Sequence, residues 1–269
     1  MPTKISVAAR VLFVSLVYVV LYGLMQVAAA LSLLPVSANL ADYQAKVLSN
    51  LFVCSFIAIA VSLVLYAAFG LLRERPILRE VRFRTISAST VIKTIVLALA
   101  LRGAVAVYGV FSESVPALQE SLESAPDITG AIDSFPKLML CFLLIVLVAP
   151  IFEEILFRGL VQTELMRGFP AWVSILLSSL IFGAMHGNLF QSLFTVFCGL
   201  AMGWCYYRTG SILTSIVLHI TFNTSVLFQL MIYDAPAAVQ IAVSVISIAA
   251  AFFAVRSIAH EYPLADREQ

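Results

Sequence analysis

The sequence predicts an all-α, polytopic integral membrane protein with about eight transmembrane helices. Of its 269 residues, 62% are hydrophobic and only 12% are charged. An ordinary soluble domain is about half apolar and about a quarter charged, and it needs a polar surface. Apolar stretches of membrane-spanning length recur along the whole chain, and the charges gather between them. Lipid must therefore be the solvent for most of this protein.

Eight stretches meet or nearly meet the length of about 20 apolar residues that a spanning helix needs. The first follows Lys4 and Arg10. Its apolar run of about 24 residues is too long for a signal-peptide core, so we expect a retained helix. We predict a single transmembrane domain over residues 1–269. Its helices are expected at about 11–34, 51–72, 89–111, 137–166, 171–187, 190–207, 211–231 and 236–258.

Charged residues in the loops predict the orientation. Arginines crowd the 73–84 loop, and acidic residues crowd the 113–136 loop. Because cytoplasmic loops carry an excess of Lys and Arg, we expect a multi-pass cell-membrane protein with both termini cytoplasmic and the 113–136 loop outside. The net charge of +1 leaves no basic surplus, which excludes nucleic acid as a partner. The later charges that fit this orientation are Arg167, Arg208, Arg256 and Arg267 inside and Asp234 outside.

The densest polar cluster inside a predicted helix includes Glu153, Glu154 and Arg158. A charge at the bilayer centre costs about 2.5–3.5 kcal/mol, so each needs a reason. Glu154 and Arg158 are spaced i, i+4 with the acid first, which favours an ion pair. Glu153 points about 100° away, so this pairing makes Glu153 the candidate for chemistry. Pro150 removes a backbone hydrogen bond, and we expect a helix break beside a wet pocket.

A second candidate is His186, which follows Phe182 by one helical turn. A lone histidine in an apolar helix is more often a packed residue than a catalyst. However, Glu153 lies about 16 residues before the turn at 168–170, and His186 about 17 residues after it. In an antiparallel hairpin these two side chains end nearly level and could share one water.

The third feature is His219 with Asn223, which are stacked i, i+4 on one helix face. They could join helices by hydrogen bonds or donate to a reacting oxygen. Counting the helical rise per residue along each helix places His219 about 10 Å nearer the cytoplasm than His186. Tilted helices could close this gap. Arg102 lies in the middle of the third predicted helix. Either it snorkels to the interface or the helix ends are shifted, or it is an anchor for a substrate carboxylate.

Together these residues form a set that could activate water. Glu153 can act as general base, with His186 positioning the water or passing the proton. His219 and Asn223 can stabilise the oxyanion of a tetrahedral intermediate. The matching reaction is hydrolysis of an amide within the membrane. One Glu and two His could instead bind zinc, and the spacing does not separate these alternatives. All aspartates fall in loops, which disfavours an aspartyl protease.

The three motifs, in this order, resemble the CPBP (Abi) family, which includes CaaX prenyl proteases of the Rce1 type and bacteriocin-processing or immunity proteins. They are Glu153-Glu154-x-x-x-Arg158, Phe182-x-x-x-His186 and His219-x-x-x-Asn223. The resemblance covers about 135–230, the expected catalytic core, and implies an intramembrane endopeptidase with an active-site cavity. It implies Glu153 and His186 as catalytic residues, His219 and Asn223 as the oxyanion pair, and Glu154 and Arg158 as further site residues. A divalent metal such as zinc stays open.

The resemblance implies a peptide or protein substrate, lipid-modified or membrane-embedded, that meets the enzyme beside membrane lipid. Two non-enzymatic classes stay open. A transporter also places Glu, His and Arg in the membrane, and an immunity or scaffold protein could use the same groups to pack helices. Cleavage that is lost in Glu153→Gln separates the protease from both alternatives.

Overall fold

The predicted all-α fold class is confirmed. The computed structural model describes residues 4–112, 114–123, 132, 134–225 and 236–263, and within these it contains helices and no strand. Among these described residues, six helical spans are long and apolar enough to cross a membrane, and two of the predicted stretches form the shorter apolar helices Ala171–Ala184 and Ile212–Thr224. The end of the predicted 211–231 helix lies outside the described residues, as do Asp234 and Arg267. The six long spans are Ile5–Val36, Leu51–Leu72, Ala88–Val105, Phe135–Leu165, Leu189–Thr209 and Ala238–Glu261.

The chain divides into two compact units. The first unit comprises Met1–Val81 with Pro126–Gly168, and the second comprises Arg82–Ala125 with Phe169–Gln269. The single transmembrane domain over 1–269 stays a prediction.

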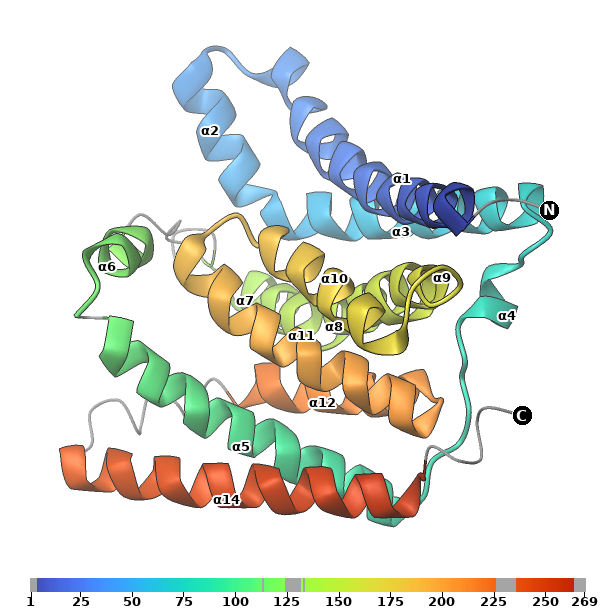
Figure 1. The fold of residues 1–269 in the computed structure, drawn as a ribbon. Coiled ribbons are helices and arrows are strands. Elements are labelled where there is room, and N and C mark those ends of the chain that lie inside the picture. Colours follow the sequence, from blue (N-terminus) through green and yellow to red (C-terminus); the bar gives the residue numbers. More distant parts are fainter. Residues whose placement is uncertain (1–3, 113, 124–131, 133, 226–235, 264–269) are drawn as a thin grey trace. The chain divides into compact units, whose positions relative to one another are not determined.

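In the first unit, α1 (Lys4–Leu31) and α3 (Leu51–Leu72) lie side by side (Figure 1). The Tyr66 hydroxyl of α3 donates to the Tyr18 carbonyl of α1 at 2.8 Å. This bond satisfies a buried phenol inside an apolar helix pair, where an unsatisfied polar group would be costly. A 3₁₀ turn at Leu34–Val36 and the short helix α2 (Leu40–Ser49) connect α1 to α3, and the short helix α4 (Ile77–Glu80) follows α3.

The long helix of the first unit, which spans 135–165, is not broken at Pro150. It continues from α7 (Phe135–Phe142) through α8 (Ala149–Glu154) to α9 (Thr163–Leu165). The expectation of a break was therefore wrong. Two π-helical segments, Leu143–Val148 and Ile155–Gln162, flank α8 instead. The wider π turn just before Pro150 gives the chain another way to continue past a residue that lacks an amide N–H.

In the second unit, α5 (Ala88–Ser112) and α14 (Ala237–Glu261) lie side by side (Figure 1). The pair α10 (Ala171–Ala184) and α11 (Leu189–Thr209) forms a second close contact, and α12 (Ile212–Thr224) packs on α5 and α11. The predicted 113–136 loop contains a helix, α6 (Pro116–Glu123), whose Ser121 hydroxyl accepts from the Phe190 amide at 3.1 Å. Residues 113, 124–131 and 133 of that loop lie outside the described residues.

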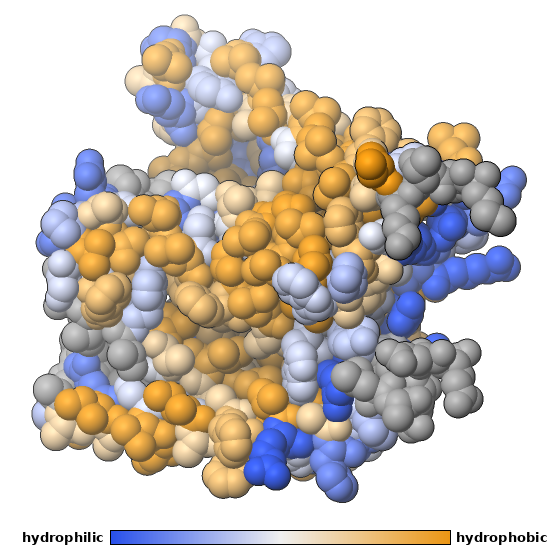
Figure 2. Space-filling view, in the orientation of Figure 1, coloured by the Kyte–Doolittle hydropathy of each residue, from blue (hydrophilic) through white to orange (hydrophobic). Residues whose placement is uncertain are grey.

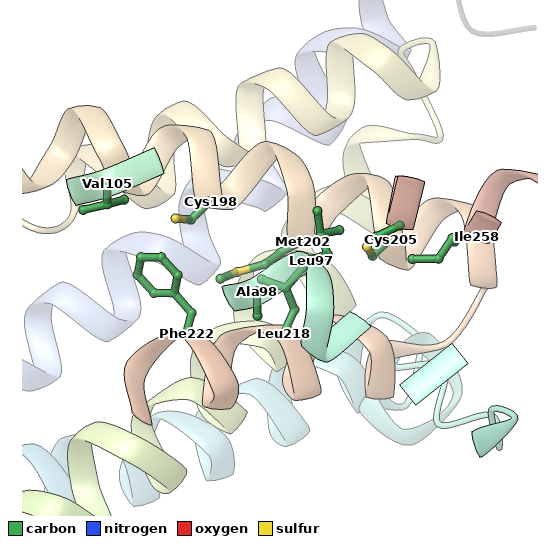
Figure 3. Packing of buried hydrophobic residues seen from close by; sticks show 10 residues of the cluster. Leu97, Ala98, Val105, Cys198, Met202, Cys205, Leu218, Phe222 and Ile258 are labelled. Carbon is green, nitrogen blue, oxygen red and sulfur yellow. The ribbon is translucent and has the colours of Figure 1, made fainter. Parts of the chain in front are cut away.

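The core of the second unit is a cluster contributed by α5, α11, α12 and α14. Figure 3 shows Leu218 and Phe222 pointing from α12 toward Cys198 and Met202 of α11. Because Phe222 is only 4% exposed, this cluster fixes the last turn of α12 against its neighbours. The members are Leu97, Ala98, Val105, Cys198, Met202, Cys205, Leu218, Phe222, Ala254 and Ile258.

The close contact of α10 with α11 depends on small residues. A Cβ placed on Gly183 would lie 2.5 Å from Val196 Cγ2 and 2.7 Å from the Ser192 carbonyl oxygen. A Cβ on Gly199 would lie 3.0 Å from Ser179 Cβ. Small residues at such contacts let two helix backbones approach closely, as in other membrane helix pairs.

The outward faces of the long helices are apolar. Figure 2 shows hydrophobic side chains along much of α14, and Ile246 and Phe253 are 66% and 68% exposed. A soluble protein seldom exposes such a continuous apolar face, whereas lipid chains cover it without cost. Together with the six spans, this surface supports a multi-pass membrane protein.

Candidate active site

Glu154 and Arg158 form the predicted ion pair in the first unit. Arg158 Nη1 donates to Glu154 Oε1 at 2.8 Å, and the two side chains are 0–1% exposed. The i, i+4 expectation is confirmed. A buried ion pair contributes little net stability relative to an apolar pair of the same shape, but loss of one partner strands a charge. The stability of the helix around Glu154 and Arg158 therefore depends on both residues.

The Glu154–Arg158 pair lies where α8 changes into the second π-helical segment, which begins at Ile155. The Thr163 hydroxyl donates to the Arg158 carbonyl, five residues back, at 3.0 Å. Short π segments inside helices occur frequently at functional sites, because they redirect side chains without ending the helix. The sequence pattern gave no sign of this segment.

Glu153 is half-buried on α8, next to a tyrosine of α1. The ring of Tyr22 lies 4.7 Å from that of Phe152, centroid to centroid, and the Tyr22 hydroxyl is close enough to Glu153 to interact electrostatically. Gln26 Nε2 donates to the Tyr22 hydroxyl at 2.6 Å. The Tyr22 oxygen thus accepts one bond and keeps its own hydrogen to donate. Sequence reasoning missed Tyr22, although its i, i+4 spacing from Gln26 was a visible signal.

In the second unit, the two histidine motifs meet at one aromatic ring. The Phe182 ring lies 4.9 Å from the His186 ring and 5.8 Å from the His219 ring, both edge-on. His186 is half-buried and His219 is 5% exposed. The difference in height that helix geometry predicted between His186 and His219 therefore does not keep these two histidines apart.

The tautomer of His186 follows from its hydrogen bond. Its Nδ1 lies 2.9 Å from the Phe182 carbonyl oxygen, which can only accept. Nδ1 therefore carries the hydrogen, and in the neutral ring Nε2 is an acceptor. An imidazole fixed in this way can accept a hydrogen bond from a water or hold an added proton at Nε2.

Asn223 is half-buried on α12, one turn after His219. Between them, Phe222 is held by Arg102 of α5, whose Nη2 donates to the Phe222 carbonyl. Arg102 Nε also donates to the Ser225 hydroxyl at 3.1 Å. Arg102, for which the sequence allowed more than one interpretation, thus binds the end of the helix that carries His219 and Asn223.

The predicted site residues fall into both units. Glu153, with the Glu154–Arg158 pair, belongs to the first unit, and His186, His219 and Asn223 belong to the second. A water shared by Glu153 and His186 therefore stays a prediction. Within the described part of the chain, no three His, Cys, Asp or Glu side chains form a group that could hold a metal ion. Because Glu153 belongs to one unit and the two histidines to the other, this finding does not decide between a zinc site and a glutamate base.

The fold and these polar residues define a multi-pass helical membrane protein with polar motifs in and beside its apolar helices. Residues 135–225 match the family model "Type II CAAX prenyl endopeptidase Rce1-like". The match contains all three motifs, so the resemblance to this family is confirmed over those residues. It supports a CAAX-protease-like membrane peptidase.

Two curated relatives share part of the sequence. "Putative membrane peptidase YdiL" of Bacillus subtilis (strain 168) is 34% identical over 83 residues, which is 31% of this chain and 34% of the relative. "Uncharacterized 24.3 kDa protein" of Escherichia coli is 32% identical over 97 residues, 34% of this chain and 44% of the relative. The chain thus spans less than half the length of these relatives. No solved structure matches.

Proposed function

We propose that this protein is an intramembrane endopeptidase that hydrolyses a peptide bond with a water activated by Glu153 and His186. The observation that carries the proposal is the contact of His186 and His219 with the same Phe182 ring, which brings two distant motifs together. A match over 135–225 to an endopeptidase family supports the same conclusion.

Glu153 is the proposed general base. Its carboxylate removes a proton from water as the water oxygen bonds to the carbonyl carbon of the scissile amide. The proton then passes to the amide nitrogen, the C–N bond breaks, and an acid and an amine leave. His186 supports this transfer because its fixed tautomer presents Nε2 as an acceptor for the same water. General-base catalysis of this kind contributes about 10²–10⁴-fold to the rate.

His219 and Asn223 are the proposed oxyanion donors. The negative charge that develops on the carbonyl oxygen needs donors that are already in position, and both side chains project from one face of α12. A single donor of this type is worth about 10²–10³-fold in kcat in other hydrolases.

The Glu154–Arg158 pair supports the site rather than reacting. Its burial and its 2.8 Å hydrogen bond hold the segment that contains Glu153. Because both side chains are already committed to each other in a dry environment, we assign them a structural role next to the base.

The proposed substrate is a peptide or protein that is lipid-modified or embedded in the membrane. The family description names CAAX prenyl endopeptidases, so a prenylated C-terminal peptide is the first substrate to test. The proposed orientation places both termini in the cytoplasm, following the arginines of the 73–84 loop.

Cleavage assays on purified protein in nanodiscs test the proposal. Prenylated and unprenylated hydrophobic peptides are incubated with the parent protein and with Glu153→Gln and His186→Ala, and products are identified by mass spectrometry. We expect cleavage by the parent and a loss of at least about 10²-fold in Glu153→Gln. Equal cleavage by parent and Glu153→Gln, or substrate-dependent ion flux without any cleavage, contradicts the proposal.

A further inference from the structure

The helix that carries His219 and Asn223 is too short to cross a bilayer. α12 has 13 residues, about 20 Å of helix, against a hydrocarbon core of about 30 Å. The last four carbonyls of a helix have no partner within it, and lipid offers none. Here the Ser225 amide donates to the Thr221 carbonyl at 3.0 Å, and the Ser225 hydroxyl donates to the Phe222 carbonyl at 2.7 Å.

Arg102 completes this helix end from a neighbouring helix. Its Nη2 donates to the Phe222 carbonyl, and its Nε donates to the Ser225 hydroxyl at 3.1 Å. A cation at a helix C-terminus is stabilised by the negative end of the helix dipole. Arg102 is only 7% exposed, so these contacts form where competing water is scarce.

The same guanidinium also holds the Phe222 side chain. The Arg102 guanidinium carbon lies 3.7 Å from the centroid of the Phe222 ring, a cation–π contact. Arg102 therefore contacts Phe222 at both its carbonyl and its ring. The Phe222 ring also belongs to the core cluster (Figure 3). Fixing one residue at two points sets the rotation of the last turn of α12 about its axis.

We infer that Arg102 is a positioning residue that sets the direction in which Asn223 and His219 point. Asn223 follows Phe222 directly, and His219 lies three residues before it. This inference rests on the proposed function, because it assigns these two side chains to the oxyanion. It replaces the reading of Arg102 as an anchor for a substrate carboxylate, since the guanidinium is engaged by Phe222 and Ser225.

The kinetic test compares Arg102→Met and Arg102→Lys with the parent on matched free-acid and amidated peptides. Arg102→Met should lower kcat by about 10²-fold on both peptides with KM little changed, because misplacement by about 1 Å can cost that much. Arg102→Lys should recover part of the rate, since one ammonium can still donate to the Phe222 carbonyl. Ser225→Ala, which keeps the arginine, should lower kcat in the same way but by less.

The matched control is Lys93→Met. Lys93 also lies on α5, but it pairs with Glu261 of α14 at 2.5 Å. This variant should lower the melting temperature and leave the kcat of the folded protein unchanged. A loss of kcat in Arg102→Met that Lys93→Met reproduces at equal melting temperature overturns the positioning role, and so does a loss confined to free-acid peptides.

A second readout does not depend on activity. Hydrogen–deuterium exchange in nanodiscs should be faster over residues 216–225 in Arg102→Met than in the parent, and unchanged there in Lys93→Met. Unaltered exchange in Arg102→Met contradicts the inference. The kinetic arms also separate the two proposals. If Glu153→Gln abolishes hydrolysis while Arg102→Met retains full kcat, only the positioning role fails. If Glu153→Gln cleaves as the parent does, the proposed function itself fails.

Discussion

Glu153 and Glu154 are adjacent, yet substitution of Glu154 should lower stability, whereas substitution of Glu153 should lower only the rate of hydrolysis. Glu154 is fully buried and bonded to Arg158 at 2.8 Å. Glu154→Ala leaves the arginine charge in a dry environment, and loss of one partner of a buried pair typically costs about 3–5 kcal/mol. We expect a large fall in melting temperature, with activity lost as a consequence. Glu153 is half-buried, so Glu153→Gln keeps shape and should melt like the parent while hydrolysis falls by about 10²-fold or more.

The chain provides a matched control for the pair. Asp42 and Lys46 have the same i, i+4 spacing with the acid first, and they lie 2.7 Å apart, but their side chains are about one-third exposed, at 33% and 35%. The hydrogen bond from Lys46, with that from the Ala38 amide, lowers the pKa of the Asp42 carboxyl. The Asp42 carboxyl is therefore ionised at neutral pH. Because water screens it, Asp42→Asn should change the melting temperature little.

Fluorescence-detected melting of these variants in one detergent supplies the stability values, and peptide hydrolysis supplies the rates. Replacing Glu154 by Gln together with Arg158 by Met should recover much of the stability, since no stranded charge remains. The division of roles is refuted if Glu153→Gln melts far below Glu154→Ala. It is also refuted if the double variant recovers nothing, or if Asp42→Asn is as damaging as Glu154→Ala.

Four further predictions follow from the fold and the site. Gly183→Ala should cost at least about 1–3 kcal/mol by overpacking, whereas Gly23→Ala, which meets nothing within 4 Å, should be neutral or stabilising in the same melting assay. Tyr22→Phe should slow hydrolysis with little change in melting, because it removes a hydroxyl that interacts electrostatically with the proposed base Glu153. In a background without reactive cysteines, Glu120→Cys should be labelled from outside intact cells and Arg79→Cys only after lysis; the reverse pattern would invert the topology. Hydrolysis should survive chelation with no metal found by elemental analysis, and one zinc per chain whose removal abolishes activity and whose return restores it would contradict this.

Hydropathy predicted most of the fold because lipid imposes a simple rule on helix length. The expected stretch 51–72 coincides with α3, and 89–111 differs from α5 by one residue at each end. The short helices α2 and α6 were not predicted, since each has ten residues or fewer and mixes polar with apolar side chains. The prediction of a helix break at Pro150 was wrong for another reason. Local rules for proline assume an α-helix and take no account of π turns.

The candidate site was predictable where its contacts are local in sequence. The Glu154–Arg158 bond follows from helix spacing alone. By contrast, Arg102 meets Phe222 across 120 positions, and Tyr22 approaches Glu153 from the first helix of the chain. Such contacts depend on which helix faces pack together, and neither composition nor periodicity encodes that choice. Sequence reasoning could mark Arg102 as anomalous but could not assign its partners.

The two short helices of the second unit suggest why the polar motifs stand where they do. α10 and α12 have 14 and 13 residues, so each must end before it has crossed the hydrocarbon core. Each end exposes the carbonyl of a phenylalanine close to the terminus, and in each a polar side chain binds that carbonyl: His186 binds Phe182, and Arg102 binds Phe222. Irregular backbone at membrane depth is tolerated only inside protein or against a water-filled cavity. The proposed hydrolysis needs both water and polar groups at membrane depth, and we expect helices that end early to supply the place for both. Substitution of His186 or Arg102, which bind these two carbonyls, should therefore lower the rate of hydrolysis.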